Sequence, residues 1–296
     1  MASIVAALPS TRPPFLVLAP LCVCLGTAVA YHHGLSFNLL HFVLAMVGAT
    51  LSAVAVNTLN EYQDFHSGLD LVTQRTPFSG GSGLLKEQGQ LSQAVLRLFQ
   101  GSLVGVIAIG LYFVSQYGVV MAAIGLLGLA VVISYTQYLN RRPWICYISP
   151  GLGFGLLMVI GSYLVQGGEL NGAVFLIALI PFFTINNLLL VNQFPDIHAD
   201  KQVGRNHLAI AYGVNTAVIT FVVSAVLAIN ALLGAVVVKV LPFTALMVFP
   251  VLLLSFAAIP KLRYLGANIA EHPPSMAINA VVANVAPLLL AISLLL

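Results

Sequence analysis

Two short segments of the chain carry the residues most able to do chemistry. The first, N-E-Y-Q-D-F-H-S, begins at Asn60, and the second, N-Q-F-P-D-I-H-A, begins at Asn192. Only eight of the 296 residues are acidic, and five of these lie in or just after the two segments: Glu61, Asp64, Asp70, Asp196 and Asp200. Carboxylate and amide oxygens are the ligands of hard cations such as Mg²⁺, which also takes water and substrate phosphate. The pair therefore predicts a magnesium site for a phosphorylated substrate.

The spacing within each segment predicts that the oxygen ligands share one face of a helix. Residues four apart lie one above the other on a helix, which aligns Asn60 with Asp64. The same rule aligns Asn192, Asp196 and Asp200. Because proline cannot donate a backbone hydrogen bond, Pro195 predicts that the second helix kinks or loosens near Phe194.

Basic residues and glycines follow both segments. Arg75 opens the stretch R-T-P-F-S-G-G-S-G, and Lys201 and Arg205 follow the second segment in K-Q-V-G-R. A guanidinium can donate two hydrogen bonds to a phosphate, and glycines allow backbone N–H groups to approach it closely. We therefore predict that Arg75, Lys201 and Arg205, together with Asn192, bind the phosphate groups of the substrate.

The composition indicates what kind of protein must position these residues. The chain is 60% hydrophobic and 6% charged, with a mean hydropathy of +1.02, which excludes an ordinary soluble domain. A helix of about 20 apolar residues spans a bilayer, and lipid leaves no other partner for the backbone polar groups. We expect a single domain, 1–296, that is an all-α polytopic membrane protein with a lipid partner and no nucleic-acid partner. Nine apolar stretches are candidate spans: 14–31, 37–58, 92–114, 118–137, 147–166, 172–191, 212–236, 241–259 and 276–295.

The basic residues predict the orientation of these spans. Ten of the eleven flank the N-terminus or the connections after the second, fourth, sixth and eighth spans, and Lys239 alone lies on the other side. The positive-inside rule then places the N-terminus in the cytoplasm and the C-terminus outside, in what we expect to be a bacterial plasma membrane. The two motif-bearing loops, 57–91 and 186–211, follow spans four apart. They are thus expected on the same cytoplasmic face of a parallel pseudo-repeat around a central cavity.

The motifs resemble those of the UbiA-type intramembrane polyprenyltransferases, which pair an N-D-x-x-D-like motif with a D-x-x-x-D motif. In this chain N-E-Y-Q-D-F-H-S-G-L-D stands for the first and D-I-H-A-D for the second. The resemblance implies that Asn60, Asp64, Asp196 and Asp200 are catalytic. It also implies a set of metal ligands, namely Asn60, Glu61, Asp64, Asn192, Asp196 and Asp200. Glu61 stands where the family more often has Asp, and Asp70 lies beyond the usual four-residue step.

The activity that the resemblance implies is the Mg²⁺-dependent transfer of a polyprenyl group from an allylic polyprenyl diphosphate to a small aromatic acceptor. Tyr62, Tyr135 and Tyr138 are candidates to shield the allylic cation with their rings. The first motif is similar to that of the branch that prenylates 1,4-dihydroxy-2-naphthoate for menaquinone. Prenylation of 4-hydroxybenzoate, homogentisate or a glycerol phosphate lipid remains an alternative.

An ion-coupled secondary transporter is a different class of protein that also carries intramembrane acids and internal repeats. Transporter sites lie near the middle of the bilayer, where both sides can reach them. Here the acids are predicted at helix ends on one face, beside arginines and glycines. The sequence therefore favours the enzyme.

Overall fold

The computed structural model describes residues 4–296, which are helical with short connections and contain no strand. Eight helical segments in this range are long and apolar enough to cross a membrane: Pro13–His32, Leu39–His66, Gly89–Tyr117, Pro143–Leu164, Gly172–Asn192, Leu208–Val237, Phe243–Glu271 and Pro273–Ser293. A shorter apolar helix, α7 (Val119–Ser134), lies between the third and fourth of these. The nine segments match the nine predicted spans, so the predicted all-α membrane fold is confirmed.

The helices divide into long membrane-spanning elements and short elements between them. The long ones are α2 (Leu18–His32), α3 (Leu39–His66), α6 (Ser92–Tyr117), α10 (Gly172–Asn192), α12 (Leu208–Val237), α13 (Phe249–Leu265) and α14 (Pro273–Ser293). One span is composite, formed by α8 (Pro143–Pro150), the π-helical η4 (Gly151–Met158) and α9 (Val159–Leu164). The short helices are η1 (Ile4–Thr11), α1 (Pro13–Leu16), α4 (Leu69–Val72), α5 (Leu84–Glu87), η2 (Gly89–Leu91), η3 (Leu139–Arg141), α11 (Ile197–Gln202), η5 (Phe243–Val248) and η6 (Gly266–Glu271).

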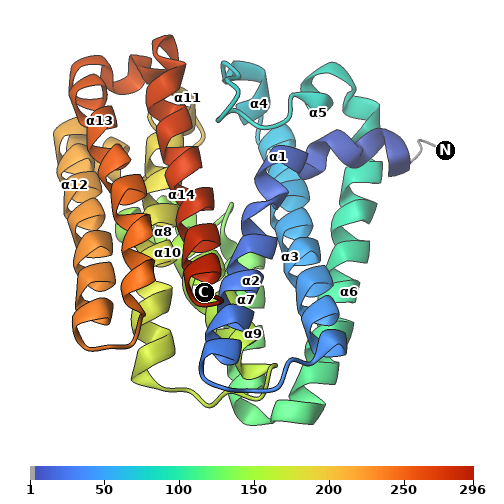
Figure 1. Cartoon of the computed structure of the whole chain (residues 1–296). Coiled ribbons are helices and arrows are strands. Elements are labelled where there is room, and N and C mark those ends of the chain that lie inside the picture. The colour runs from blue at the N-terminus through green and yellow to red at the C-terminus, as the bar shows by residue number, and fades with distance from the viewer. Residues whose placement is uncertain (1–3) are drawn as a thin grey trace.

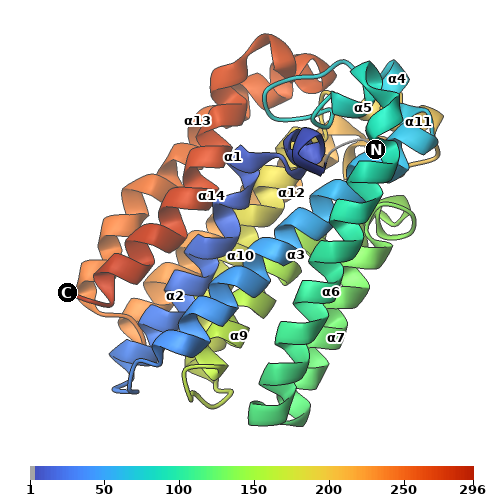
Figure 2. The ribbon, with the colours of Figure 1, turned by 90° about the vertical axis from the view of Figure 1, so that its right-hand side faces the viewer.

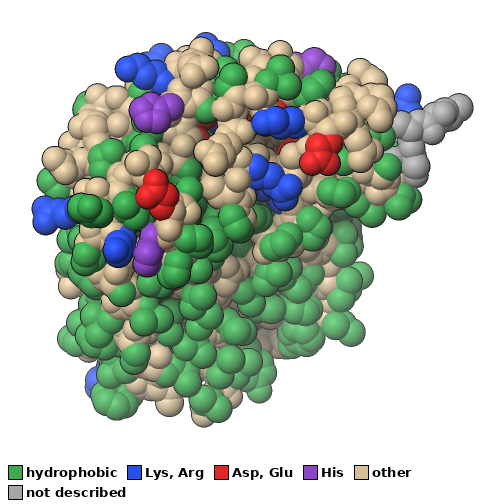
Figure 3. Space-filling view, turned by 90° about the horizontal axis from the view of Figure 1, so that it is seen from above, with side chains coloured by type: hydrophobic (Ala, Val, Ile, Leu, Met, Phe, Trp, Pro, Cys, Tyr) green, Lys and Arg blue, Asp and Glu red, His purple; other side chains and the backbone are tan. Residues whose placement is uncertain are grey.

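The long helices run side by side, and the short helices α1, α4, α5 and α11 gather at one end of the bundle (Figure 1). We call this the motif end, because α3 and α10 both finish there. The N-terminal residues lie at the motif end and the C-terminus lies at the opposite end (Figure 2). Viewed onto the motif end, the surface carries a concentration of Lys, Arg, Asp, Glu and His side chains (Figure 3).

Local sequence explains how α3 delivers its acids to the motif end. The helix begins where the Asn38 side chain accepts a hydrogen bond from the backbone N–H of His41 (3.1 Å), which satisfies a free donor of the first turn. It ends at His66, and Gly68 then adopts a left-handed conformation (φ 79°) that few other residues tolerate. That turn starts α4 at once and brings Asp70 back toward α3.

The other acid-bearing helix, α10, is held by close contacts with its neighbours. A side chain at Gly155 would come within 2.5 Å of the Phe182 backbone, so only glycine allows this approach. The Asn186 side chain accepts a hydrogen bond from the Gly151 N–H (2.6 Å), and Asn187 donates to the Phe221 carbonyl (2.9 Å). These two amides therefore bind neighbouring helices, and they fix the helix that ends at Asn192.

Candidate active site

A cavity of about 410 Å³ opens among the helices, and its lining changes from polar to apolar with depth. At the motif end it is lined by seven polar or charged residues of the two motifs: Asn60, Asp64, Asp70, Asn192, Asp196, Asp200 and Arg205. The structure thus brings together side chains from α3, α4, α10 and α11 that lie more than 120 residues apart in the sequence. All seven were predicted as site residues.

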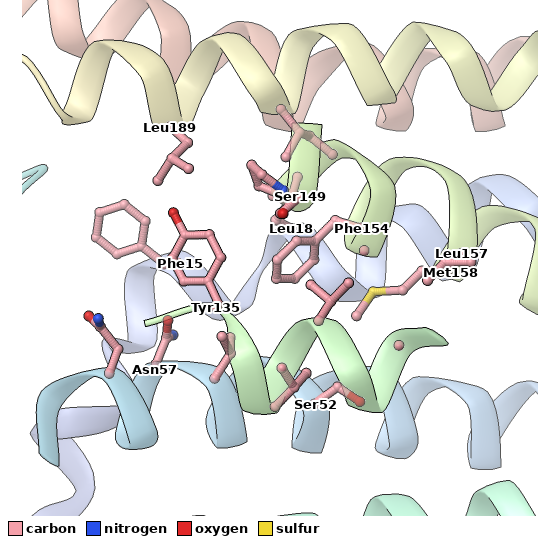
Figure 4. Close-up of a pocket in the computed structure, with 18 of the residues that line it drawn as sticks. Phe15, Leu18, Ser52, Asn57, Tyr135, Ser149, Phe154, Leu157, Met158 and Leu189 are labelled. Atoms are coloured by element: carbon pink, nitrogen blue, oxygen red, sulfur yellow. The ribbon is translucent and has the colours of Figure 1, made fainter. Parts of the chain in front are cut away.

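Below this polar mouth the cavity is apolar. It follows α3 from Asn60 to Ala45, which is about 22 Å at a rise of about 1.5 Å per residue. Its walls in this part include Phe154, Leu157 and Met158 of the composite span (Figure 4). The cavity therefore has the form expected for a ligand with an anionic head and a long hydrocarbon tail.

The second motif differs from its prediction in one respect. We expected one continuous helix with a kink near Phe194, but α10 ends at Asn192 and α11 begins at Ile197. Pro195 has no N–H to extend the helical hydrogen bonds, which agrees with a complete break. The predicted single stripe of Asn192, Asp196 and Asp200 is therefore wrong as a helix face, although all three line the cavity.

Two oxygens of the second motif are buried without a partner. The Oδ1 atoms of Asn192 and Asp196 have no hydrogen-bond partner in the structure. Buried polar atoms are almost always paired, so an exception in a cavity wall points to a ligand. Burial, and next the neighbouring Asp200 carboxylate, raise the pKa of Asp196 to about 7.

Arg205 connects the two motifs. It forms an ion pair with Asp64 of the first motif, and its Nη1 lies 2.9 Å from Asp200 Oδ1 in the second. Burial by itself lowers the pKa of this guanidinium, but the two carboxylates outweigh burial and raise it. Arg205 thus places one positive charge between carboxylates that would otherwise repel each other.

Glu61 lies in the first motif but supports a loop. Its carboxylate accepts hydrogen bonds from the Ser82 backbone N–H (2.8 Å) and from the Ser82 hydroxyl. A side chain at Gly81 would lie 3.1 Å from Glu61 Oε2, and Gly81 has a φ of 71°. Glu61 is buried and is absent from the cavity lining. It therefore anchors the glycine-rich loop beside the mouth, and its predicted role as a metal ligand stays a prediction.

Asp70, the late acid of the first motif, does line the mouth of the cavity. Burial, and next the charges of Asp64 and Glu61, raise the pKa of Asp70 to about 7. The turn at Gly68 brings this side chain toward the other acids despite its irregular spacing. The structure thus adds a third acidic side chain from the first motif region to the site.

Four predicted residues lie outside the cavity in this structure. Arg75 and Lys201 are exposed to solvent, Tyr138 is exposed, and Tyr62 packs against His66 with ring centroids 4.2 Å apart. None of the four lines the cavity, whereas Tyr135 does. Any contact of Arg75 or Lys201 with a bound phosphate would need their loops to move, and their predicted role stays a prediction.

The donor set at the mouth fits a hard cation, although no complete metal site is preformed. Within residues 4–296 there is no group of three or more His, Cys, Asp or Glu side chains arranged to hold a metal. Mg²⁺ commonly binds one or two carboxylates and completes its shell with water and substrate phosphate. The unpaired oxygens of Asn192 and Asp196 are ligands of this type. The site therefore suits Mg²⁺ that arrives with a phosphorylated substrate.

The sequence motifs did not identify two residues of the site. Arg12, at the end of η1, lines the cavity mouth, and the buried His207 places Nε2 3.4 Å from Asp200 Oδ2. Burial lowers the pKa of Arg12, and the carboxylate of Glu61 opposes this effect. Position in the sequence gave some indication, because Arg12 directly precedes the first span and His207 follows Arg205 by two residues. No motif singled them out.

The fold and this cavity define a polytopic helical membrane protein with a polar site at one end of an apolar tunnel. A sequence model described as the UbiA prenyltransferase family matches residues 17–270. Because this match covers most of the chain, the protein belongs to the UbiA prenyltransferase family.

Curated relatives are similar over about 70% of the chain. A 1,4-dihydroxy-2-naphthoate octaprenyltransferase of Bacillus subtilis (strain 168) is 30% identical over 208 residues, covering 69% of this chain and 64% of that protein. An Escherichia coli (strain K12) protein of the same name is 29% identical over 216 residues, covering 70% and 68%. The match thus spans about two thirds of the length of these relatives.

Solved structures agree on the fold. A structure of digeranylgeranylglyceryl phosphate synthase aligns with a TM-score of 0.70 at 15% identity, covering 99% of both chains. A UbiA homolog from Archaeoglobus fulgidus, solved with GPP and Mg²⁺, aligns with a TM-score of 0.66 at 16% identity, covering 96% of this chain and 99% of that one. At such identities the likeness concerns the fold alone.

Proposed function

We propose that this protein transfers a polyprenyl group from an allylic polyprenyl diphosphate to an aromatic acceptor, with 1,4-dihydroxy-2-naphthoate as the favoured acceptor. The observation that carries the proposal is the cavity itself, in which carboxylates and a guanidinium line the mouth and apolar side chains line the remaining depth. A polyprenyl diphosphate has the same distribution of polarity. The naphthoate relatives at about 30% identity support the choice of acceptor.

The diphosphate head would lie between the two motifs. Asn60, Asp64, Asn192, Asp196 and Asp200 supply oxygen ligands for Mg²⁺, which would stabilise the negative charge that develops on the leaving diphosphate. In this proposal Arg205 keeps the carboxylates of both motifs close together and donates to the diphosphate.

Prenyl transfer breaks the allylic C–O bond, and the diphosphate leaves with the electron pair. The apolar walls exclude water from the allylic cation, and the Tyr135 ring at the mouth can stabilise it by cation–π attraction. The cation then forms a bond to a ring carbon of the acceptor, which loses a proton. Excluding water matters because water would otherwise capture the cation.

The proposed setting is a bacterial plasma membrane, with the motif end facing the cytoplasm. The distribution of basic residues supports this orientation, since ten of eleven fall on the predicted inner side. A transporter is less well supported, because the acids lie at the motif end of the bundle and the tunnel below them is apolar.

An acceptor screen tests the proposal. Purified protein in lipid would be incubated with Mg²⁺, one labelled prenyl diphosphate and separate naphthoate, benzoate, homogentisate and glycerol phosphate acceptors. We expect the naphthoate to give the main product and EDTA to abolish its formation. Product with another acceptor alone would correct the substrate, and turnover in EDTA would contradict the mechanism. No product with any acceptor would contradict prenyl transfer.

A further inference from the structure

Arg12 occupies a position at the cavity mouth for which the reaction outlined above gives it no role. It lies between η1 and α1, and its guanidinium donates to the Phe78 carbonyl at 3.4 Å. Its Cζ atom lies 4.4 Å from the centroid of the Phe15 ring. Arg12, Phe15 and Phe78 all line the cavity. A positive charge and a flat apolar surface therefore lie side by side at the entrance.

The backbone at Arg12 adopts an unfavourable conformation. Its φ of 53° and ψ of 64° are left-handed, and within residues 4–296 only Lys239 is another non-glycine residue with a positive φ. A left-handed conformation costs a non-glycine residue about 1–2 kcal/mol. Pro13 follows directly and disfavours the right-handed helical conformation at Arg12. Strain of this kind at a cavity wall is typical of a functional residue.

Neighbouring contacts hold this strained turn in place. Asn57 of α3 donates its side-chain N–H to the carbonyl of Thr11 at 2.9 Å. The Arg12 N–H donates to the Pro9 carbonyl at 3.0 Å, and its own carbonyl accepts from the Phe15 N–H at 2.9 Å. The turn is thus fixed from both sides, so the direction of the Arg12 side chain is fixed at its base.

The two arginines of the cavity differ in their partners. Arg205 pairs with two carboxylates, whereas Arg12 pairs with no carboxylate among the described residues. Its guanidinium therefore keeps most of its donors free for a ligand. A guanidinium fork matches a carboxylate in shape as well as charge.

The surroundings of Arg12 favour an aromatic ligand. The rings of Phe15 and Tyr135 both point into the same part of the cavity, with Leu189 on the α10 side (Figure 4). Flat rings bind well against other aromatic rings. The diphosphate already has oxygen ligands and Arg205 on the acidic side of the mouth.

We propose that Arg12 binds the carboxylate of the aromatic acceptor while Phe15 and Tyr135 hold its ring. This inference rests on the proposed prenyl transfer and names a determinant of its second substrate. It makes the enzyme selective for acceptors with a ring carboxylate over the corresponding phenols.

The test compares Arg12→Gln and Arg12→Gly with wild type. Glycine tolerates the left-handed backbone, so Arg12→Gly removes the side chain without adding strain. We expect both variants to raise KM for 1,4-dihydroxy-2-naphthoate about 10- to 100-fold, the range for a lost hydrogen bond to a charged group. KM for the prenyl diphosphate should change less than about twofold, because an acceptor contact adds nothing to its binding. A control, Arg97→Gln, removes an exposed charge that lies outside the cavity lining and should behave like wild type.

A binding measurement without prenyl diphosphate separates this site from the reaction. Wild type should bind 1-hydroxy-2-naphthoate more tightly than 1-naphthol, and both Arg12 variants should lose that preference. A wild type that shows this preference but transfers no prenyl group would support the site while contradicting the proposed reaction. If the variants instead raise KM for the prenyl diphosphate, or keep the preference for the carboxylated probe, the proposal is overturned.

Discussion

The two motif regions are similar in sequence, yet they hold their acids in different ways. In the first, Glu61 hydrogen-bonds Ser82 of its own loop and Asp64 pairs with Arg205. In the second, the Oδ1 atoms of Asn192 and Asp196 have no partner. The first region thus uses part of its charge to build the cavity mouth, and the second leaves ligand oxygens free. Sequence similarity between the copies therefore does not mean equal roles.

Removing one carboxylate from each region gives the largest expected effect. Asp64→Asn and Asp196→Asn should each reduce kcat by at least about 100-fold, because each loses charge that stabilises the leaving diphosphate. Only Asp64→Asn should also lower the thermal unfolding temperature, since it weakens a buried ion pair with Arg205. Rate assays and thermal unfolding of both variants test this. Near-normal turnover in both would remove these residues from the site.

A smaller effect is expected from loosening the loop of the first region. Glu61→Gln and Ser82→Ala each remove part of the contact between the carboxylate and the loop. We expect both to raise KM for the prenyl diphosphate by about three- to tenfold, equivalent to a typical hydrogen bond of about 1 kcal/mol. Equal losses in the two variants would support an anchoring role. A loss of kcat and Mg²⁺ affinity in Glu61→Gln alone would instead show that Glu61 binds the metal.

A pair of glycines offers a matched comparison between the regions. Gly81 and Gly204 both have a left-handed backbone, with φ of 71° and 79°. A methyl group at Gly81 would press on Glu61 Oε2 at 3.1 Å, whereas one at Gly204 would meet open space. Gly81→Ala should therefore reduce activity by a further two- to fivefold, roughly, relative to Gly204→Ala, whose cost is backbone strain alone. Equal activity and unfolding temperature in the two variants would show that Glu61 moves aside freely.

The smallest effect is expected at the two exposed basic residues. Arg75→Gln and Lys201→Gln should change KM for the prenyl diphosphate less than about threefold, because exposed charges contribute little in water. A loss of 30-fold or more, measured by the same assay and reduced at high salt, would show that the loops close over the diphosphate. In that case the original prediction of a cationic clamp would hold for both regions.

Particular residues show why the sequence predicted some features and missed others. Asp64, Asp196 and Asp200 were identifiable because charge in an apolar chain needs a function, and that argument requires only composition and spacing. The stripe through Asn192, Asp196 and Asp200 was wrong as a helix face because the helix stops completely before Pro195. Arg12 was missed because its importance depends on contacts with residues up to 66 positions away, such as Phe78.

The sequence by itself determined that the chain is a helical membrane protein and that its chemistry lies in two acidic motifs. Both follow from local properties, since hydropathy sets the spans and residue type sets the possible ligands. Only the tertiary structure decided which side chains share the cavity. It placed Arg205 between the motifs, assigned Glu61 to a loop, brought Asp70 and Arg12 to the mouth and left Arg75 and Lys201 outside. These outcomes depend on how distant segments pack, and residue type alone does not encode them.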